Sequence, residues 1–144
     1  MKKYNKRARF EYELSGEGVE AGISLKGIEA KAVREGHADL TASYVKILGN
    51  EIYLVNANIP AKGMEKYDPA RTRKLLLHKK EILSLATKMK QRSLQIVPVS
   101  IYNKGRLIKL YIELGKSKRK FDKKEAIKRR DIERDIEMEF RDKG

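Results

Sequence analysis

The sequence predicts a β-rich protein, a β-barrel with α-helices of the OB type, with about six strands, an inserted helical segment and a basic C-terminal tail. Three observations predict it: short β-rich runs joined by glycine-containing turns, one segment with helical spacing, and a final stretch rich in lysine and arginine. The 144 residues suit one ordinary domain. We assign residues 1–115 to the barrel and 116–144 to the tail.

The first third contains three short strand candidates, "FEYEL", "EAGISLKG" and "IEAKAV", which are separated by glycines. Two hairpins follow. In "SYVKILGNEIYLVNANI" the turn is predicted at Gly49-Asn50, and in "LQIVPVSIYNKGRLIKLYIEL" at residues 103–105. Apolar residues alternate from Ile108 to Leu114, which indicates one buried face, and Pro98 indicates a bulge or a sheet edge.

One segment has helical rather than strand periodicity. In "YDPARTRKLLLHKKEILSLATKMK", Asp68 is a candidate N-cap and Pro69 a candidate first helical residue. Leucines and other apolar residues then recur at helical spacing, which predicts one helix, or two joined near His78. Short strands with a helix between them favour a small barrel over a sandwich.

The net charge of +14 favours a polyanionic partner, either nucleic acid or an anionic membrane surface. No apolar run is long enough to span a bilayer, and the basic N-terminus lacks the apolar core of a signal peptide. There are no cysteines, so disulfides and thiolate metal sites are excluded. We expect a cytoplasmic protein.

Catalysis is not expected. The two histidines, His37 and His78, are far apart in the sequence and have no metal-binding spacing, and no P-loop or GxSxG motif is present. We therefore expect no metal and no cofactor.

Binding of RNA has better support. The run "RTRKLLLHKK" offers lysines and arginines for phosphate contacts, and three consecutive leucines cannot all face one core, so one should be exposed. Aromatic side chains that are able to stack on bases, or else to pack within the sheet, are Tyr4, Phe10, Tyr12, Tyr53, Tyr67 and Tyr102.

Six ordered blocks resemble the SmpB (small protein B) family: "NKRARFEYE", "EAGISLKGIEAKAVREG", "SYV", "YLVNANI", "DPARTRKLLLHKKEI" and "DKKEAIKRR". The resemblance implies an OB-type barrel that binds the tRNA-like domain of tmRNA. It also implies delivery of tmRNA to stalled ribosomes in a complex with elongation factor Tu. The tail would lie in the empty mRNA path near the decoding centre of the small-subunit rRNA.

The resemblance places RNA-contacting positions on Glu20, Leu76 and His78. A carboxylate such as that of Glu20 can accept hydrogen bonds from base amino groups or a 2′-OH, although an ordinary charge at the rim is the alternative. Together with Asn5 and with basic residues of the N-terminal third and of the "RTRK" run, the candidate RNA-binding set is Asn5, Lys6, Arg7, Arg9, Glu20, Lys31, Arg34, Arg71, Arg73, Lys74, Leu76 and His78.

The ribosome-binding candidates of the tail are Lys118, Arg119, Lys120, Phe121, Asp122, Lys123, Lys124, Lys128, Arg129 and Arg130. Lys124 stands where the family usually has Arg, which keeps the charge but loses the two-point hydrogen bonding of a guanidinium. Phe121 stands where His is common, so this position can stack on a base but cannot be protonated. The few favourable ion pairs do not offset helix nucleation, so we expect a tail that is disordered when free and helical on the ribosome.

Two other functions stay open. A generic basic RNA-binding or ribosome accessory protein of OB type would share the charge, the barrel and the tail. A peripheral membrane protein would use the tail as a basic amphipathic helix, but acidic residues increase towards its end, so we expect no membrane partner. We expect a monomer.

Overall fold

The computed structural model describes residues 2–63 and 65–118. Within these residues ten elements follow one another: β1 (Lys2–Tyr4), α1 (Lys6–Glu11), β2 (Tyr12–Ile23), α2 (Gly27–Arg34), β3 (Tyr44–Leu48), β4 (Glu51–Val55), β5 (Arg73–Leu76), α3 (Lys79–Arg92), β6 (Gln95–Lys104) and β7 (Leu107–Ser117). The protein is therefore mostly β, as predicted.

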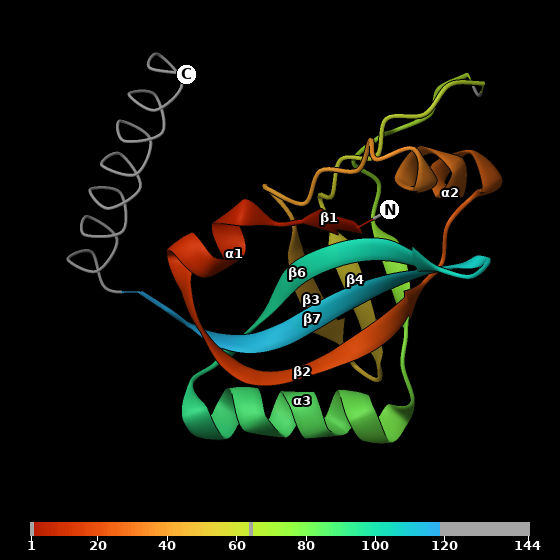
Figure 1. Ribbon diagram of the computed structural model, residues 1–144. Coiled ribbons are helices and arrows are strands. Elements are labelled where there is room, and N and C mark those ends of the chain that lie inside the picture. Colours follow the sequence, from red (N-terminus) through yellow and green to blue (C-terminus); the bar gives the residue numbers. More distant parts are fainter. Residues whose placement is uncertain (1, 64, 119–144) are drawn as a thin grey trace, which may run out of the picture.

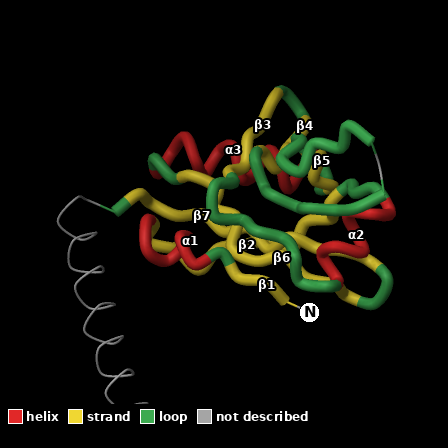
Figure 2. Tube along the Cα trace, turned by 90° about the horizontal axis from the view of Figure 1, so that it is seen from above, coloured by secondary structure: helices red, strands yellow, loops and turns green. Residues whose placement is uncertain are grey.

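The seven strands form one antiparallel sheet in the order β1-β6-β7-β2-β5-β4-β3 (Figure 1). The sheet is strongly curved (Figure 2), and β3 comes near β6 in space. Among the described residues β1 and β3 remain the two ends of the sheet and do not pair with each other. The closed OB-type barrel is therefore not confirmed, and the described part of the chain has seven strands where about six were predicted.

Both predicted hairpins are present. β3 and β4 are joined at Gly49-Asn50, where Gly49 has a φ of 60° that favours glycine. In the β6–β7 hairpin the turn lies at Gly105-Arg106, slightly later than predicted. The pairing is irregular between Pro98 and Ser100, which agrees with the bulge rather than the sheet edge of the two alternatives predicted there.

The hydrophobic core lies on the concave face of the curved sheet. The alternating residues of β7, from Ile108 to Leu114, are all buried there, as predicted. α3 runs beneath the sheet in Figure 1 and adds Ile82 and Leu85 to the core, and α2 adds Ala32 and Val33. Because α3 has only one buried stripe, its other face is free to be polar.

The N-terminal third differs from the prediction. "IEAKAV" is not a strand but most of α2, and residues 6–11 form the unpredicted helix α1. "FEYEL" and "EAGI" belong mainly to one long strand, β2, whose pairing shifts between Leu14 and Gly18. α2 forms because Glu29 accepts a hydrogen bond of 2.8 Å from the backbone N–H of Lys26, which caps the helix.

The predicted helix from Asp68 is also corrected. The carboxylate of Asp68 accepts a hydrogen bond of 2.9 Å from the backbone N–H of Ala70, which makes a turn rather than a helical N-cap. Arg73–Leu76 then forms β5, and only the part after His78 is helical. Leu76 and His78 therefore lie on a strand and at a helix N-terminus, rather than together on a helix.

β7 continues past the predicted boundary at residue 115. Lys116 and Ser117 pair with Glu13 and Tyr12 of β2, and the backbone N–H of Lys118 donates to the carbonyl of Glu11 at 2.9 Å. The body thus includes these three residues. The predictions made for residues 119–144, including Arg119 to Arg130, lie outside the described residues.

Candidate RNA interface

β5 exposes alternate side chains on the convex face of the sheet. Arg73 and Leu75 point into the protein, whereas Lys74 and Leu76 point outward, and 55% of the Leu76 surface is exposed. The prediction that one of the three consecutive leucines is exposed is confirmed. The exposed leucine therefore provides an apolar contact among charged side chains of both signs.

A surface hollow of about 680 Å³ lies over this part of the sheet. Four of the predicted RNA-binding residues line it, namely Glu20, Lys74, Leu76 and His78. They come from β2, from β5 and from the residue before α3, so the fold brings together positions that lie far apart in the sequence.

Glu20 is held in place at one side of the hollow. Its carboxylate accepts hydrogen bonds from the hydroxyl of Tyr102 and, at 3.3 Å, from Nζ of Lys104. The bond from Tyr102 lowers the pKa of Glu20 and outweighs the opposing effect of burial. Burial and the hydrogen bond to Glu20 raise the pKa of Tyr102 to about 12. At neutral pH Glu20 is therefore an anion and Tyr102 a hydrogen-bond donor.

His78 precedes α3 at the rim of the hollow. Its backbone N–H donates to the carboxylate of Glu81 at 3.2 Å, which fixes the start of the helix, while its side chain stays exposed. His78 is thus placed to face a bound molecule without being part of the core.

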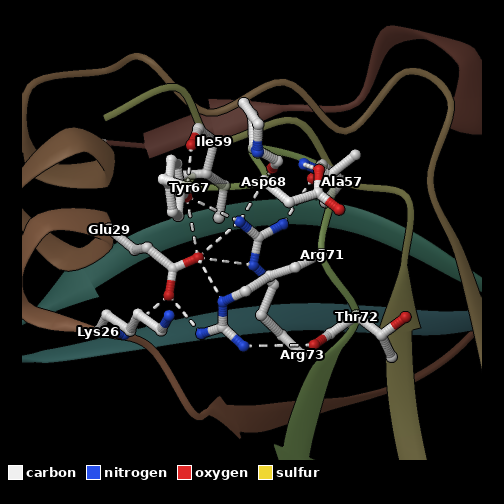
Figure 3. A network of polar contacts seen from close by, with 11 residues as sticks. Lys26, Glu29, Ala57, Ile59, Tyr67, Asp68, Arg71, Thr72 and Arg73 are labelled. Carbon is white, nitrogen blue, oxygen red and sulfur yellow. Dashed lines mark hydrogen bonds and ion pairs between the residues drawn. The ribbon is translucent and has the colours of Figure 1, made fainter. Parts of the chain in front are cut away.

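Arg73 is a correction to the predicted RNA contacts. Its side chain is fully buried, and it donates to the carboxylate of Glu29 at 2.6 and 2.9 Å and to the carbonyl of Ala57 at 2.6 Å (Figure 3). It also donates to the Tyr67 hydroxyl at 3.0 Å and to the Pro69 carbonyl at 2.9 Å. A guanidinium enclosed in this way has no surface to offer a phosphate.

Arg71 belongs to the same network. It forms a two-point ion pair with Glu29, through Nε at 3.0 Å and through Nη2, and its side chain is 28% exposed. Burial raises the pKa of Glu29, but hydrogen bonds from Arg71, the Lys26 backbone and Arg73 outweigh it and lower that pKa to about 2. Arg71 and Arg73 therefore position the segment around β5, and Lys74 alone of the three faces the hollow.

The remaining candidates are spread over other surfaces. Asn5 is buried, where it donates to the carbonyl of Pro98 at 2.8 Å and caps α1, so it is also corrected as an RNA contact. Arg7 pairs with Glu11. The exposed side chains on α1 and α2 that do not line the hollow are those of Lys6, Arg7, Arg9, Lys31 and Arg34.

Residues absent from the predicted set complete the hollow. Lys109 of β7 pairs with Gly22 of β2, and Glu51 and Lys79 lie on other sides. The alternation that buries Ile108 and Leu110 carries a signal for Lys109, since a residue between two buried neighbours must point outward. Within the described ranges no cluster of metal-ligating side chains is present, and no helix there has the length and apolar character to cross a membrane.

Three lysines and an exposed leucine around one hollow, in a chain of net charge +14, are typical of the nucleic-acid-binding class of proteins. The SmpB protein family model matches residues 2–142. The chain belongs to this family.

Curated relatives agree. An SsrA-binding protein of Prochlorococcus marinus (strain MIT 9515) is 46% identical over 136 residues, covering 92% of this chain and 82% of the relative. Another of Sulfurihydrogenibium sp. (strain YO3AOP1) is 46% identical over 142 residues, covering 96% and 93%. Among solved structures, a chain of "tmRNA-SmpB: a journey to the center of the bacterial ribosome" is 41% identical with a TM-score of 0.68, covering 88% of this chain and 94% of the other.

Proposed function

We propose that this protein binds tmRNA, the SsrA RNA, through the hollow on its convex sheet face and acts with it on stalled ribosomes in trans-translation. The observation that carries the proposal is the convergence of Glu20, Leu76 and His78 on one hollow. The relatives support it, because they are SsrA-binding proteins and the similar solved structure contains tmRNA and SmpB.

The chemistry of the hollow suits the tRNA-like domain of tmRNA. Lys74, Lys79 and Lys109 can neutralise phosphates, and Leu76 can pack against an unstacked base or a ribose. Glu20 is repelled by phosphates, so it acts instead as an acceptor for base amino groups or a 2′-OH. Lys104 beside it reduces that repulsion.

The finer parts of the function rest on family membership. We infer that residues 119–144 act in the empty mRNA path near the decoding centre, and that elongation factor Tu takes part in delivery. We further infer that the protein acts in the cytoplasm as a monomer. We also infer that it is built on an OB-type barrel and has no enzymatic activity of its own. Lys118 belongs to the body as well as to the start of the tail, since it contacts Arg9 and Glu11.

Capture of RNA from bacterial lysate tests the proposal. The tagged protein should recover tmRNA as the dominant RNA on sequencing, whereas a broad spread of RNAs would favour the generic RNA-binding alternative. A matched pair of variants then locates the interface. Leu76→Ala should reduce recovery of tmRNA, and Leu83→Ala, which removes an even more exposed leucine from α3, should not. Equal recovery by both variants would exclude the hollow.

A further inference from the structure

The hollow has a second carboxylate that is held in the same way as Glu20. Glu51, at the start of β4, accepts hydrogen bonds from the hydroxyl of Tyr53 and, at 3.1 Å, from Nζ of Lys74. Glu20 accepts from Tyr102 and from Lys104. In both cases one carboxylate oxygen faces a tyrosine hydroxyl and the other faces a lysine.

The two carboxylates flank the exposed leucine. Both Glu20 and Glu51 line the hollow, and they lie on β2 and β4, the two strands that pair with β5. Leu76 of β5 lies between them. A base that packs against Leu76 would therefore lie between two carboxylates, each held by hydrogen bonds.

The geometry leaves Glu51 able to accept more. Each carboxylate oxygen has about two acceptor sites, and among the described residues each oxygen of Glu51 has one donor. The side chain is 49% exposed, so the remaining sites are open to a bound molecule. The bonds from Tyr53 and Lys74 lower the pKa of Glu51, which keeps it ionised at neutral pH.

We propose that Glu51 is a second RNA-reading residue, which accepts two hydrogen bonds from the Watson–Crick edge of an unpaired guanine. With one open site on each oxygen, the carboxylate matches two adjacent donors. Guanine presents such a pair in N1–H and the N2 amino group, whereas adenine and cytosine place an acceptor beside their amino group and uracil has one ring donor. The edge is accessible only in a loop or at an end, where RNA-binding proteins read bases. This inference rests on the proposed function.

Whether the loss of the Glu51 charge raises or lowers the affinity for RNA distinguishes an RNA-reading residue from an ordinary surface ion pair. Removing a negative charge from a basic protein should leave its RNA affinity unchanged or raise it, because attraction to phosphates grows. Removing an acceptor that the RNA uses should lower the affinity, by about tenfold if two charge-assisted hydrogen bonds are weakened. Glu17 provides the matched control, since it is 44% exposed, is held by Lys88 and Arg92 and lies outside the hollow.

The experiment measures the affinity of full-length Glu51→Gln, Glu20→Gln and Glu17→Gln for a transcript of the tRNA-like domain of tmRNA, with thermal melts to check folding. We expect about tenfold weaker binding for Glu51→Gln and unchanged or tighter binding for Glu17→Gln. If Glu51→Gln behaves as Glu17→Gln does while Glu20→Gln weakens binding, the inference is wrong and the proposed function stands. If the unmodified protein does not bind the transcript, the proposed function itself fails.

A second arm tests the guanine. Unpaired guanines in the transcript are replaced one at a time by inosine, which lacks the N2 amino group. One replacement should weaken binding of the unmodified protein and have no further effect on Glu51→Gln, because the two changes remove the same interaction. For each inosine transcript, the affinity of the unmodified protein is divided by that of Glu51→Gln. If this ratio equals the ratio for the original transcript in every case, the assignment to guanine is overturned.

Discussion

Gly22 of β2 faces Leu76 of β5, and a Cβ atom at Gly22 would lie 3.1 Å from the Cβ of Leu76. The missing side chain at Gly22 therefore leaves room for Leu76 on the floor of the hollow. The spacing is tighter than most Cβ contacts, so any larger residue at position 22 must push the leucine aside.

Gly22→Ala should accordingly weaken binding of the tRNA-like RNA several-fold, because it displaces Leu76 without removing any charge. Gly27→Ala is the control, since a Cβ there meets nothing within 4 Å. Filter-binding titrations of both variants check this. Equal affinities would show that the position of Leu76 is unimportant for the RNA.

Arg73→Ala should lower the free energy of unfolding by about 3–5 kcal/mol, because it leaves the buried carboxylate of Glu29 with fewer partners. Urea denaturation measures the change. Lys74→Ala should melt almost as the unmodified protein does, since Lys74 is exposed. If Arg73→Ala lowers the free energy of unfolding only slightly, Arg71 alone is sufficient to stabilise the buried Glu29 carboxylate.

Lys74→Ala should instead change the salt dependence of RNA binding. If Lys74 contacts one phosphate, the slope of log affinity against log salt should fall by about 0.7–0.9. Lys90→Ala, on the exposed part of α3, should leave the slope unchanged. Identical slopes for the two variants would remove Lys74 from the phosphate contacts.

Acid should destabilise the protein through Glu29. Its pKa is about 2 in the folded state, below the ordinary value of 4.5, so its contribution is complete above pH 4.5 and is lost as the pH falls through 2. The difference corresponds to about 3 kcal/mol. Unfolding free energies measured from pH 6 to pH 2 should therefore fall more steeply for Glu35→Gln, an exposed control, than for Glu29→Gln. If the unfolding free energies of the two variants fall in parallel with pH, Glu29 is not the group whose protonation destabilises the fold.

Truncation should locate the end of the body. A chain ending at Lys118 should keep its thermal stability and its RNA binding, whereas one ending at Gly115 should melt at a lower temperature, because it lacks the pairs of Lys116 and Ser117 with β2 and the bonds of Lys118. Calorimetry of the two chains checks this. If both melt alike, β7 does not need its last residues.

Much of the sheet could be predicted from the sequence. The turn at Gly49-Asn50 and the alternation from Ile108 to Leu114 are local signals, and both lead to the observed hairpins. The hollow was predictable only in part. Family resemblance pointed to Glu20, Leu76 and His78, but their meeting depends on the pairing of β2 with β5, which no local pattern encodes.

Two of the errors, in α2 and in β5, share a physical origin. Interpretation of "IEAKAV" and "RKLLL" did not allow for charged residues that face the core. Glu29 and Arg73 are buried because each neutralises the other, and Leu76 is exposed. Because charged side chains are buried and a leucine is exposed in these segments, their hydrophobic pattern indicated a strand where α2 forms and a helix where β5 forms. A long-range ion pair between residues 44 positions apart leaves no signal in either segment alone.

The buried Arg73 also bears on how the chain finds its strand pairing. Three successive leucines provide almost no information on alignment, since sliding β5 by one residue would still bury a leucine on the concave face. The same slip would turn Arg73 towards solvent, bring Lys74 inward and leave the buried Glu29 carboxylate without its main buried partner. A misaligned sheet is thus penalised by an unpaired buried charge, so the ion pair selects the register that a leucine-rich strand leaves undetermined.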